Sequence, residues 1–172
     1  MKTTKNRGLA LLILAALTLT VTLGANGAEA NAQEVLYVVH YAQRDLARTG
    51  LTDVGRGKAK ALARMLIDAG IDVIYSTKTS WVVQTAEPTA KALNITINNH
   101  PSHEKAVDDL VRRLRTQHAK DRVFIAAALP TMQQILRGFG FTDLEVLSAR
   151  KDTLFVIIPR SGSEPQVIKL RW

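Results

Sequence analysis

Four residues of differing chemistry follow the first apolar run of the chain, in the order His40, Tyr41, Ala42 and Gln43. An imidazole titrates near neutral pH, so a neutral His is available as a nucleophile at working pH. An unperturbed phenol has a pKa of about 10 and is a poor nucleophile unless neighbouring cations lower that value. From residue type alone, His40 is the side chain in this segment best suited to nucleophilic chemistry.

Three cations, Arg44, Arg56 and Lys78, fall on or near the loops that follow expected strands. Guanidinium and ammonium groups contact phosphate oxygens readily, and the free N–H groups at helix amino ends also attract anions. These residues are therefore candidates for weak anion binding. The simpler alternative, which we favour, is that they are solvated surface charges.

A metal site is not expected. His100 and His103 flank a loop that also carries Glu104, but spacing of this kind is weak evidence and loop histidines are usually exposed. We expect no cofactor either. The chain contains no cysteine, which excludes disulfides and a lipid-modified cysteine.

The elements that must position these residues alternate between short apolar runs and segments of helical periodicity. This alternation predicts an α/β domain, with a mainly parallel sheet and helices on both faces in a three-layer sandwich. In such sheets ligands bind beyond the carboxyl ends of the strands, so the residues after Val39, Tyr75 and Ala127 should meet at one edge. The expected strands are Val35–Val39, Ile71–Tyr75, Ile95–Ile97, Val123–Ala127, Thr153–Ile158 and Gln166–Leu170. The expected helices are Thr52–Ala69, Ser80–Leu93, a segment around Val107–Leu114, and Thr131–Phe139.

Two helices carry more specific expectations. The first should begin at a Thr52 cap and stop at Gly70, and Pro88 should bend or split the second. The buried face of the first helix is expected to consist of Leu62, Met65, Leu66 and Ala69, which follow the spacing of one apolar stripe.

The amino-terminal segment has the pattern of a secretory signal. Lys2, Lys5 and Arg7 precede the apolar run Gly8–Leu23, and Ala-x-Ala sites follow within residues 28–32. We predict cleavage before Gln33, which leaves residues 33–172 as one periplasmic or secreted domain. An uncleaved membrane anchor is the alternative, although the run is shorter than the roughly 20 residues that a spanning helix prefers.

The charge balance is modestly basic. The whole chain carries +8, and removal of residues 1–32 leaves 20 Lys and Arg against 14 Asp and Glu, or +6. This balance favours anionic ligands. The basic residues do not alternate with aromatic residues as they do on a stacking surface, so we expect no nucleic-acid partner.

Three segments, taken together and in this order, resemble the histidine phosphatase superfamily, also called phosphoglycerate mutase-like. They are Leu51–Arg56, Tyr75–Thr77 and Gln84–Pro88. The resemblance covers nearly all of residues 33–172 and is closest to the short bacterial branch that acts on phosphohistidine and small phosphoesters. It implies the phosphoglycerate mutase-like fold and, for an active member, a phosphatase reaction without a metal.

The residues that the resemblance would assign to catalysis are replaced. Family members carry an Arg-His pair at the end of the first strand, followed by a small and an acidic residue; here the three functional positions hold His40, Tyr41 and Gln43. The position of a second arginine holds Trp81, and that of a second histidine holds Ala128. We expect Trp81 to fill the volume of the lost arginine and close the pocket, rather than to stack on a ligand.

Phosphoryl transfer depends mainly on positioning and on stabilising negative charge. Loss of a single electrostatic donor can cost roughly a hundred- to a thousand-fold in rate. The sequence therefore predicts an exported, catalytically inactive member of the superfamily that binds an anion, a phosphorylated ligand or a protein partner. The alternative is an active metal-independent phosphatase that acts on phosphomonoesters or phosphohistidine through an unconventional site, with His40 or another group attacking. Strand alternation opposes attack by His40, because a shift of one residue turns the side chain to the other face.

Overall fold

Strands and helices alternate along the chain in the computed structural model, which describes residues 34–141, 152–160 and 162–172. The predicted export signal over residues 1–32 lies outside these residues. The strands are β1 (Val35–His40), β2 (Arg44–Asp45), β3 (Gly50–Leu51), β4 (Val73–Thr77), β5 (Ile97–His100), β6 (Arg122–Ala127), β7 (Thr153–Ile158) and β8 (Gln166–Arg171). The helices are α1 (Asp53–Leu66), α2 (Ser80–Leu93), α3 (Glu104–Gln117) and α4 (Leu129–Gly138).

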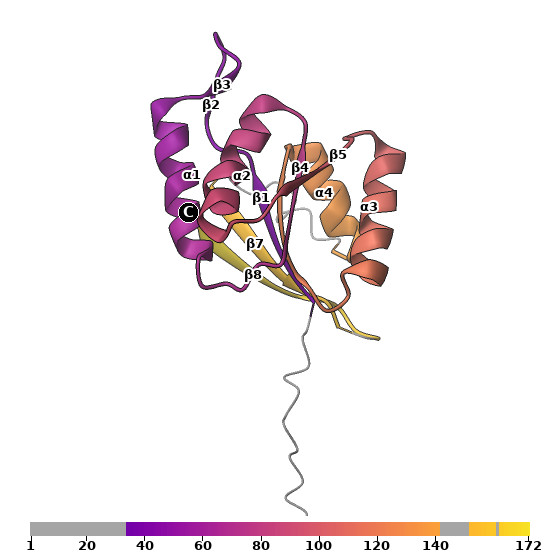
Figure 1. The fold of residues 1–172 in the computed structure, drawn as a ribbon. Coiled ribbons are helices and arrows are strands. Elements are labelled where there is room, and N and C mark those ends of the chain that lie inside the picture. Colours follow the sequence, from indigo (N-terminus) through magenta and orange to yellow (C-terminus); the bar gives the residue numbers. More distant parts are fainter. Residues whose placement is uncertain (1–33, 142–151, 161) are drawn as a thin grey trace, which may run out of the picture.

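The main sheet has the strand order β5-β4-β6-β1-β7-β8. The four strands from β5 to β1 are parallel to one another, whereas β7 is antiparallel to β1 and β8 is antiparallel to β7. Helices α1 and α2 lie on one side of this sheet and α3 and α4 on the other (Figure 1). The predicted α/β class, with a mainly parallel sheet between two helical layers, is confirmed.

Each face of the sheet has its own apolar core, and successive residues of β1 supply both. Val38 belongs to the core on the α3 and α4 side, whereas Val39 belongs to the core on the α1 and α2 side. Both are fully buried. A strand that is buried on both faces requires a continuous apolar run, which explains why the sequence of β1 predicts a buried strand.

Two strands begin two residues later than the sequence pattern predicts. The predicted Ile71–Tyr75 is β4 (Val73–Thr77), because the Asp72 N–H donates to the Arg122 carbonyl at 2.8 Å and its carboxylate accepts from the Arg122 N–H before the strand starts. The predicted Ile95–Ile97 is β5, which continues through polar residues to His100. An edge strand can carry polar side chains, so the apolar run marked only its beginning.

The expectations for α1 and α2 are met in part. Thr52 caps α1, and its hydroxyl accepts a hydrogen bond from the Gly55 N–H at 3.0 Å. The helix ends at Leu66, ahead of Gly70, whose φ of 66° is the left-handed conformation that glycine adopts easily. The expectation that Met65 is buried is wrong, since this side chain is 44% exposed.

Pro88 does not split α2, which runs unbroken from Ser80 to Leu93. Residues on both sides of the proline, including Ala86 and Thr89, are fully buried. This packing holds the helix together despite the loss of one main-chain donor. In the described part of the chain, no helix is both long and apolar enough to cross a membrane.

Candidate functional site

The carboxyl ends of β1 and β6 meet at one edge of the sheet. His40 lies opposite Ala127 in the parallel register, and the Tyr41 N–H donates to the Ala127 carbonyl at 3.1 Å. Ala128, the next residue, is the amino-terminal cap of α4 and offers no side-chain hydrogen bond there. The structure therefore brings together three of the positions that the sequence marked, His40, Tyr41 and Ala128.

His40 is buried at this edge, with only 4% of its surface exposed. Its Nδ1 lies 2.9 Å from the carbonyl oxygen of Tyr41, so this nitrogen carries the proton and donates it to that oxygen. The rings of His40 and Tyr41 are 4.0 Å apart and inclined by 35°. Alternation thus does not send the two rings to opposite sides, because β1 ends at His40 and Tyr41 lies beyond the regular strand.

Trp81 lies over the same edge, at the first turn of α2. Its ring packs edge-on against Tyr41, with 6.1 Å between centroids, and the Arg44 guanidinium carbon lies 4.9 Å from its centroid. Trp81 also packs against the buried residues Ala42 and Leu51. The indole is half-buried in this region, and its contact with Arg44 is a cation–π interaction.

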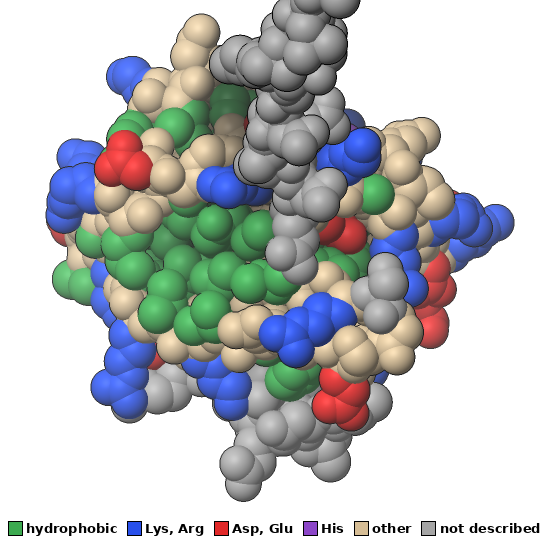
Figure 2. Space-filling model, turned by 90° about the horizontal axis from the view of Figure 1, so that it is seen from below, with side chains coloured by type: hydrophobic (Ala, Val, Ile, Leu, Met, Phe, Trp, Pro, Cys, Tyr) green, Lys and Arg blue, Asp and Glu red, His purple; other side chains and the backbone are tan. Residues whose placement is uncertain are grey.

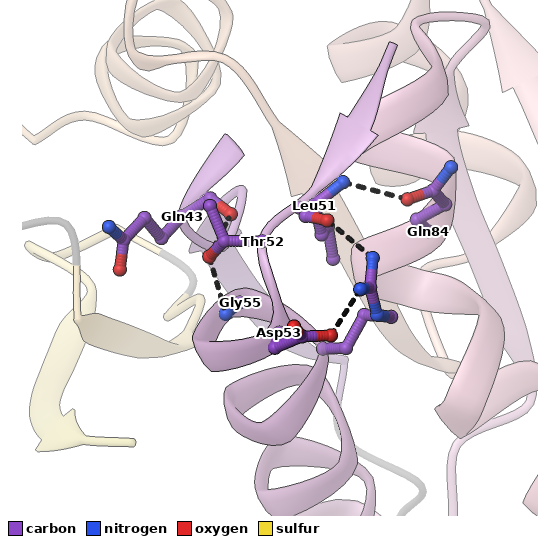
Figure 3. Close-up of polar contacts among 7 residues, drawn as sticks. Gln43, Leu51, Thr52, Asp53, Gly55 and Gln84 are labelled. Atoms are coloured by element: carbon purple, nitrogen blue, oxygen red, sulfur yellow. Dashed lines mark hydrogen bonds and ion pairs between the residues drawn. The ribbon is translucent and has the colours of Figure 1, made fainter. Parts of the chain in front are cut away.

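The loop after β1 is held by its main chain rather than by the side chain of Gln43 (Figure 3). That side chain is exposed, while the Gln43 carbonyl accepts hydrogen bonds from the Thr52 N–H at 3.0 Å and the Thr52 hydroxyl at 3.3 Å. Gly55 packs directly against this carbonyl, and a Cβ at Gly55 would lie 2.2 Å from the oxygen. The Leu51–Arg56 segment therefore shapes the edge of the site through its backbone.

The Gln84–Pro88 segment has a similar structural role. The Gln84 side-chain oxygen accepts a hydrogen bond from the Leu51 N–H at 2.9 Å (Figure 3), and the Thr85 hydroxyl accepts one from the Ala42 N–H at 3.0 Å. Both bonds join α2 to the loop between β1 and α1. These residues position the edge of the sheet through hydrogen bonds to its main chain.

The three candidate cations differ in their surroundings. The Arg56 guanidinium donates to the Leu51 carbonyl at 2.5 Å and pairs with the Asp53 carboxylate, so two of its nitrogens are engaged within the protein. Lys78 is exposed on the loop between β4 and α2. Arg44 alone of the three borders the cavity described next. Weak anion binding by Arg44, Arg56 or Lys78 therefore stays a prediction.

A cavity of about 560 Å³ opens beside Tyr41 and Arg44. Its cationic lining comes from Arg44 and Lys58, and its aromatic lining from Tyr41 and the carboxyl-terminal residue, Trp172. The full lining is Tyr41, Ala42, Gln43, Arg44, Leu46, Lys58, Asp152 and Trp172. This arrangement suits a small anionic ligand with a flat or apolar part.

Sequence reasoning missed Lys58, Asp152 and Trp172 as members of this site. Trp172 arrives there because β8 runs back along β7, and its N–H donates to the Asp152 carbonyl at 3.1 Å. Lys58 arrives from the second turn of α1. No local motif marks any of these residues, so only the pairing of β7 with β8 and the placement of α1 could have revealed them.

His100 and His103 take part in structure rather than in a ligand cluster. His100 is buried at the end of β5, where burial lowers the pKa of its imidazole, and its Nδ1 donates to the Pro101 carbonyl at 2.8 Å. His103 caps α3 by accepting from the Ala106 N–H. Among the described residues, no three His, Cys, Asp or Glu side chains are grouped as metal ligands.

Comparison with known proteins identifies the fold. The family model described as the histidine phosphatase superfamily (branch 1) matches residues 34–104, which include the carboxyl end of β1, α1 and α2. No curated protein matches the chain.

Solved structures that resemble this chain cover most of the described domain. A candidate phosphohistidine phosphatase from Agrobacterium tumefaciens has a TM-score of 0.60 at 21% identity, covering 80% of this chain and 97% of its own. Phosphoserine phosphatase from Entamoeba histolytica, in complex with 3-phosphoglyceric acid, has a TM-score of 0.62 at 12% identity, with 81% and 97% covered. A candidate α-ribazole-5′-phosphate phosphatase from Escherichia coli gives the same four values. At these identities the likeness concerns the fold.

Proposed function

Because this chain belongs to the histidine phosphatase superfamily, we propose that it is an exported, catalytically silent member that binds an anionic ligand beside the former active site. The neighbouring structures are those of phosphatases, one of them in complex with 3-phosphoglyceric acid, and sheets of this kind bind ligands beyond the carboxyl ends of their strands. The proposal is that this chain retains the edge and the binding, and has lost the chemistry.

The observation that carries the loss of chemistry is the burial of His40. It is the one imidazole placed at the carboxyl end of β1, and it is 4% exposed with Nδ1 donating to a main-chain carbonyl. A nucleophile must come within about 3–3.5 Å of the phosphorus atom, with its lone pair aligned. A ring enclosed to this degree has little surface with which to approach a substrate.

Charge stabilisation is the second part of the argument. The Arg44 guanidinium lies over the Trp81 ring, where it makes a cation–π contact. Arg56 is engaged by Asp53 and by the Leu51 carbonyl. The developing charge of a phosphoryl-transfer transition state needs donors already aimed at it, and neither arginine supports such a role here.

The proposed ligand site is the cavity between Arg44, Lys58, Tyr41 and Trp172. Two cations on its wall favour an anion, and the aromatic side chains offer faces for a flat or apolar group. A phosphate or carboxylate carried on a small aromatic or aliphatic frame fits this combination. Binding of a single anion by partly exposed cations is expected to be weak.

Tryptophan fluorescence tests the binding directly, because one of the two tryptophans, Trp172, lines the cavity and the other, Trp81, packs against the same apolar cluster as Trp172. Titration of phenyl phosphate into the purified protein is expected to change the emission with a saturable profile, and Arg44→Gln and Lys58→Gln should each weaken binding several-fold. Arg64→Gln, an exposed change on α1 away from the cavity, is the matched control. An unsaturable response, or equal loss in all three variants, would contradict the site.

The catalytic alternative is tested by the same protein. If His40 works as a nucleophile, rapid quench with a phosphoester substrate should trap a phosphorylated protein, and His40→Gln should abolish the trapped species. We expect none above the blank.

A further inference from the structure

The two edges of the main sheet are protected to different degrees. One edge strand, β5, has four residues, carries Asn98 and Asn99 and is followed by Pro101. The other, β8, has six residues; it carries the exposed cations Lys169 and Arg171, and it also exposes Ile168 and Leu170, by 41% and 42%. Natural sheets shorten or polarise an edge strand, or cover it with a partner. The contrast raises the question of what covers β8, on whose outer side no strand of the described residues pairs.

Ile168 and Leu170 continue an apolar face of the sheet. Ile168 lies opposite Val156 of β7, which in turn lies opposite Tyr37 of β1. This is the face that α1 and α2 cover over the neighbouring strands (Figure 1). Seen from below, hydrophobic side chains form one broad patch with Lys and Arg at its margins (Figure 2).

The outward main-chain groups of β8 can be identified from its pairing with β7. The Trp172 N–H donates to the Asp152 carbonyl, and these two residues continue the register in which Thr153 lies opposite Arg171. In an antiparallel ladder every second residue is hydrogen-bonded to its opposite. The even-numbered residues of β8 therefore bond to β7, and the odd-numbered residues, Val167 and Lys169 among them, direct their N–H and C=O groups outward.

We infer that β8 pairs with β8 of a second copy of this chain, antiparallel and about a two-fold axis that passes beside Ile168. This inference is independent of the proposed ligand site, which lies at the carboxyl edge of the sheet. In the dimer Val167 of each copy exchanges hydrogen bonds with Lys169 of the other. The two sheets become one, and the apolar faces meet at the paired Ile168 side chains.

The charges on β8 select this register. With a two-fold axis perpendicular to the sheet, each residue of one β8 lies opposite a residue of the other β8 on the same face of the sheet. Two such registers pair five residues of each strand, one centred on Ile168 and the other on Lys169. Centring on Lys169 places two ammonium groups directly opposite each other and Arg171 opposite Val167, and like charges directly opposite are destabilising. Centring on Ile168 places each Lys169 opposite Val167, so no cation faces a cation.

Cysteine cross-linking tests the register, since the chain has no cysteine of its own. Ile168→Cys should form a disulfide-linked dimer under mild oxidation, because residues opposite each other in a non-hydrogen-bonded pair have Cα atoms about 4.5 Å apart. Leu170→Cys should not, since the second Leu170 lies four residues along the partner strand, at about 3.3 Å per residue. Equal cross-linking of both variants, or of neither, would overturn the proposed pairing.

Sedimentation of the purified protein tests the dimer without cross-linking. We expect a monomer–dimer equilibrium at tens of micromolar, as befits a small interface. Ile168→Lys should raise the dissociation constant at least tenfold, because it places two like charges opposite each other, whereas Leu170→Lys, opposite Gln166, should have a smaller effect. Monomer at every concentration would overturn the inference. A second result would also overturn it: a monomeric protein that binds phosphatidylglycerol vesicles, with this binding lost equally in both variants. The patch would then be a surface that contacts a membrane.

Discussion

The hydroxyl of Thr85 accepts a hydrogen bond at 3.0 Å from the main-chain N–H of Ala42, two residues beyond the end of β1. The same hydroxyl donates to the Trp81 carbonyl at 2.8 Å, so a single buried oxygen joins α2 to the loop that follows His40. The segment that most resembles the superfamily around α2 thus has a structural role that does not depend on catalysis. The proposed loss of the catalytic side chains would therefore leave this contact, and the edge that it holds, in place.

Removal of this hydroxyl should destabilise the protein. Thr85→Val keeps the shape of the side chain but leaves the buried Ala42 N–H without its acceptor, at a cost of about 1–3 kcal/mol. Urea unfolding measures the change. Thr85→Ser retains the oxygen and should recover much of the lost stability; equal destabilisation by both variants would mean that the methyl packing, and not the hydrogen bond, matters.

Gly55 and Gly57 make a matched pair in α1. Alanine at position 55 would bring its Cβ to 2.2 Å from the Gln43 carbonyl oxygen, whereas a Cβ at position 57 meets nothing within 4 Å. We expect Gly55→Ala to destabilise the fold by more than 1 kcal/mol and to displace the loop after β1. Gly57→Ala should stabilise it by about 0.5–1 kcal/mol, because alanine is the better helix former. Thermal unfolding of the two variants checks both signs, and similar effects would contradict the described packing.

His100 should make stability fall in mild acid. Burial lowers the pKa of its imidazole from 6.5, and its buried Nε2 has no hydrogen-bond partner. Between pH 6.5 and that lower value the unfolded chain binds more protons than the folded one, so stability decreases as the pH falls through this window. His100→Asn, which retains a donor for the Pro101 carbonyl, should flatten the profile there. An unchanged slope would assign the acid sensitivity to another group.

Glu34 should act in the opposite direction. Burial raises the pKa of its carboxyl from 4.5 to about 7, although Arg115 opposes the shift. The folded protein then binds the proton more tightly than the unfolded chain, so stability decreases as the pH rises from about 4.5 to 7. Unfolding measured across this range with Glu34→Gln should show a shallower decrease, by on the order of 1–3 kcal/mol in total. The exposed change Glu87→Gln should leave the slope as it is.

The sequence predicted the layered α/β fold because its strands and helices differ clearly in period. The boundaries of β4 and β5 moved where tertiary contacts decided them: a hydrogen-bonded pair between Asp72 and Arg122 delays β4, and β5 extends through polar residues at the sheet edge. The β2–β3 hairpin was missed, because two-residue strands such as Arg44–Asp45 leave no periodic pattern.

The candidate site was predictable only where it follows strand ends. His40, Tyr41 and Ala128 meet because β1 and β6 are adjacent and parallel, which the alternation of elements implies. The contributions of Lys58 and Trp172 depend on how a helix and the last strand pack, and no local pattern encodes that. The resemblance indicated the positions at which we propose that catalytic residues are replaced, whereas the burial of His40 and the engagement of Arg56 required the structure.

The central claim is tested most directly by restoring the side chains that the family resemblance implies. Hydrolysis of an aryl phosphate is measured for the purified protein and for the fourfold variant His40→Arg, Tyr41→His, Trp81→Arg and Ala128→His, both checked for folding by circular dichroism. We predict no activity above the buffer blank for the unmodified chain and a rate at least a hundred-fold higher for the variant, in keeping with the cost of losing even one transition-state donor. Turnover by the unmodified chain that matches or exceeds that of the variant would contradict the account.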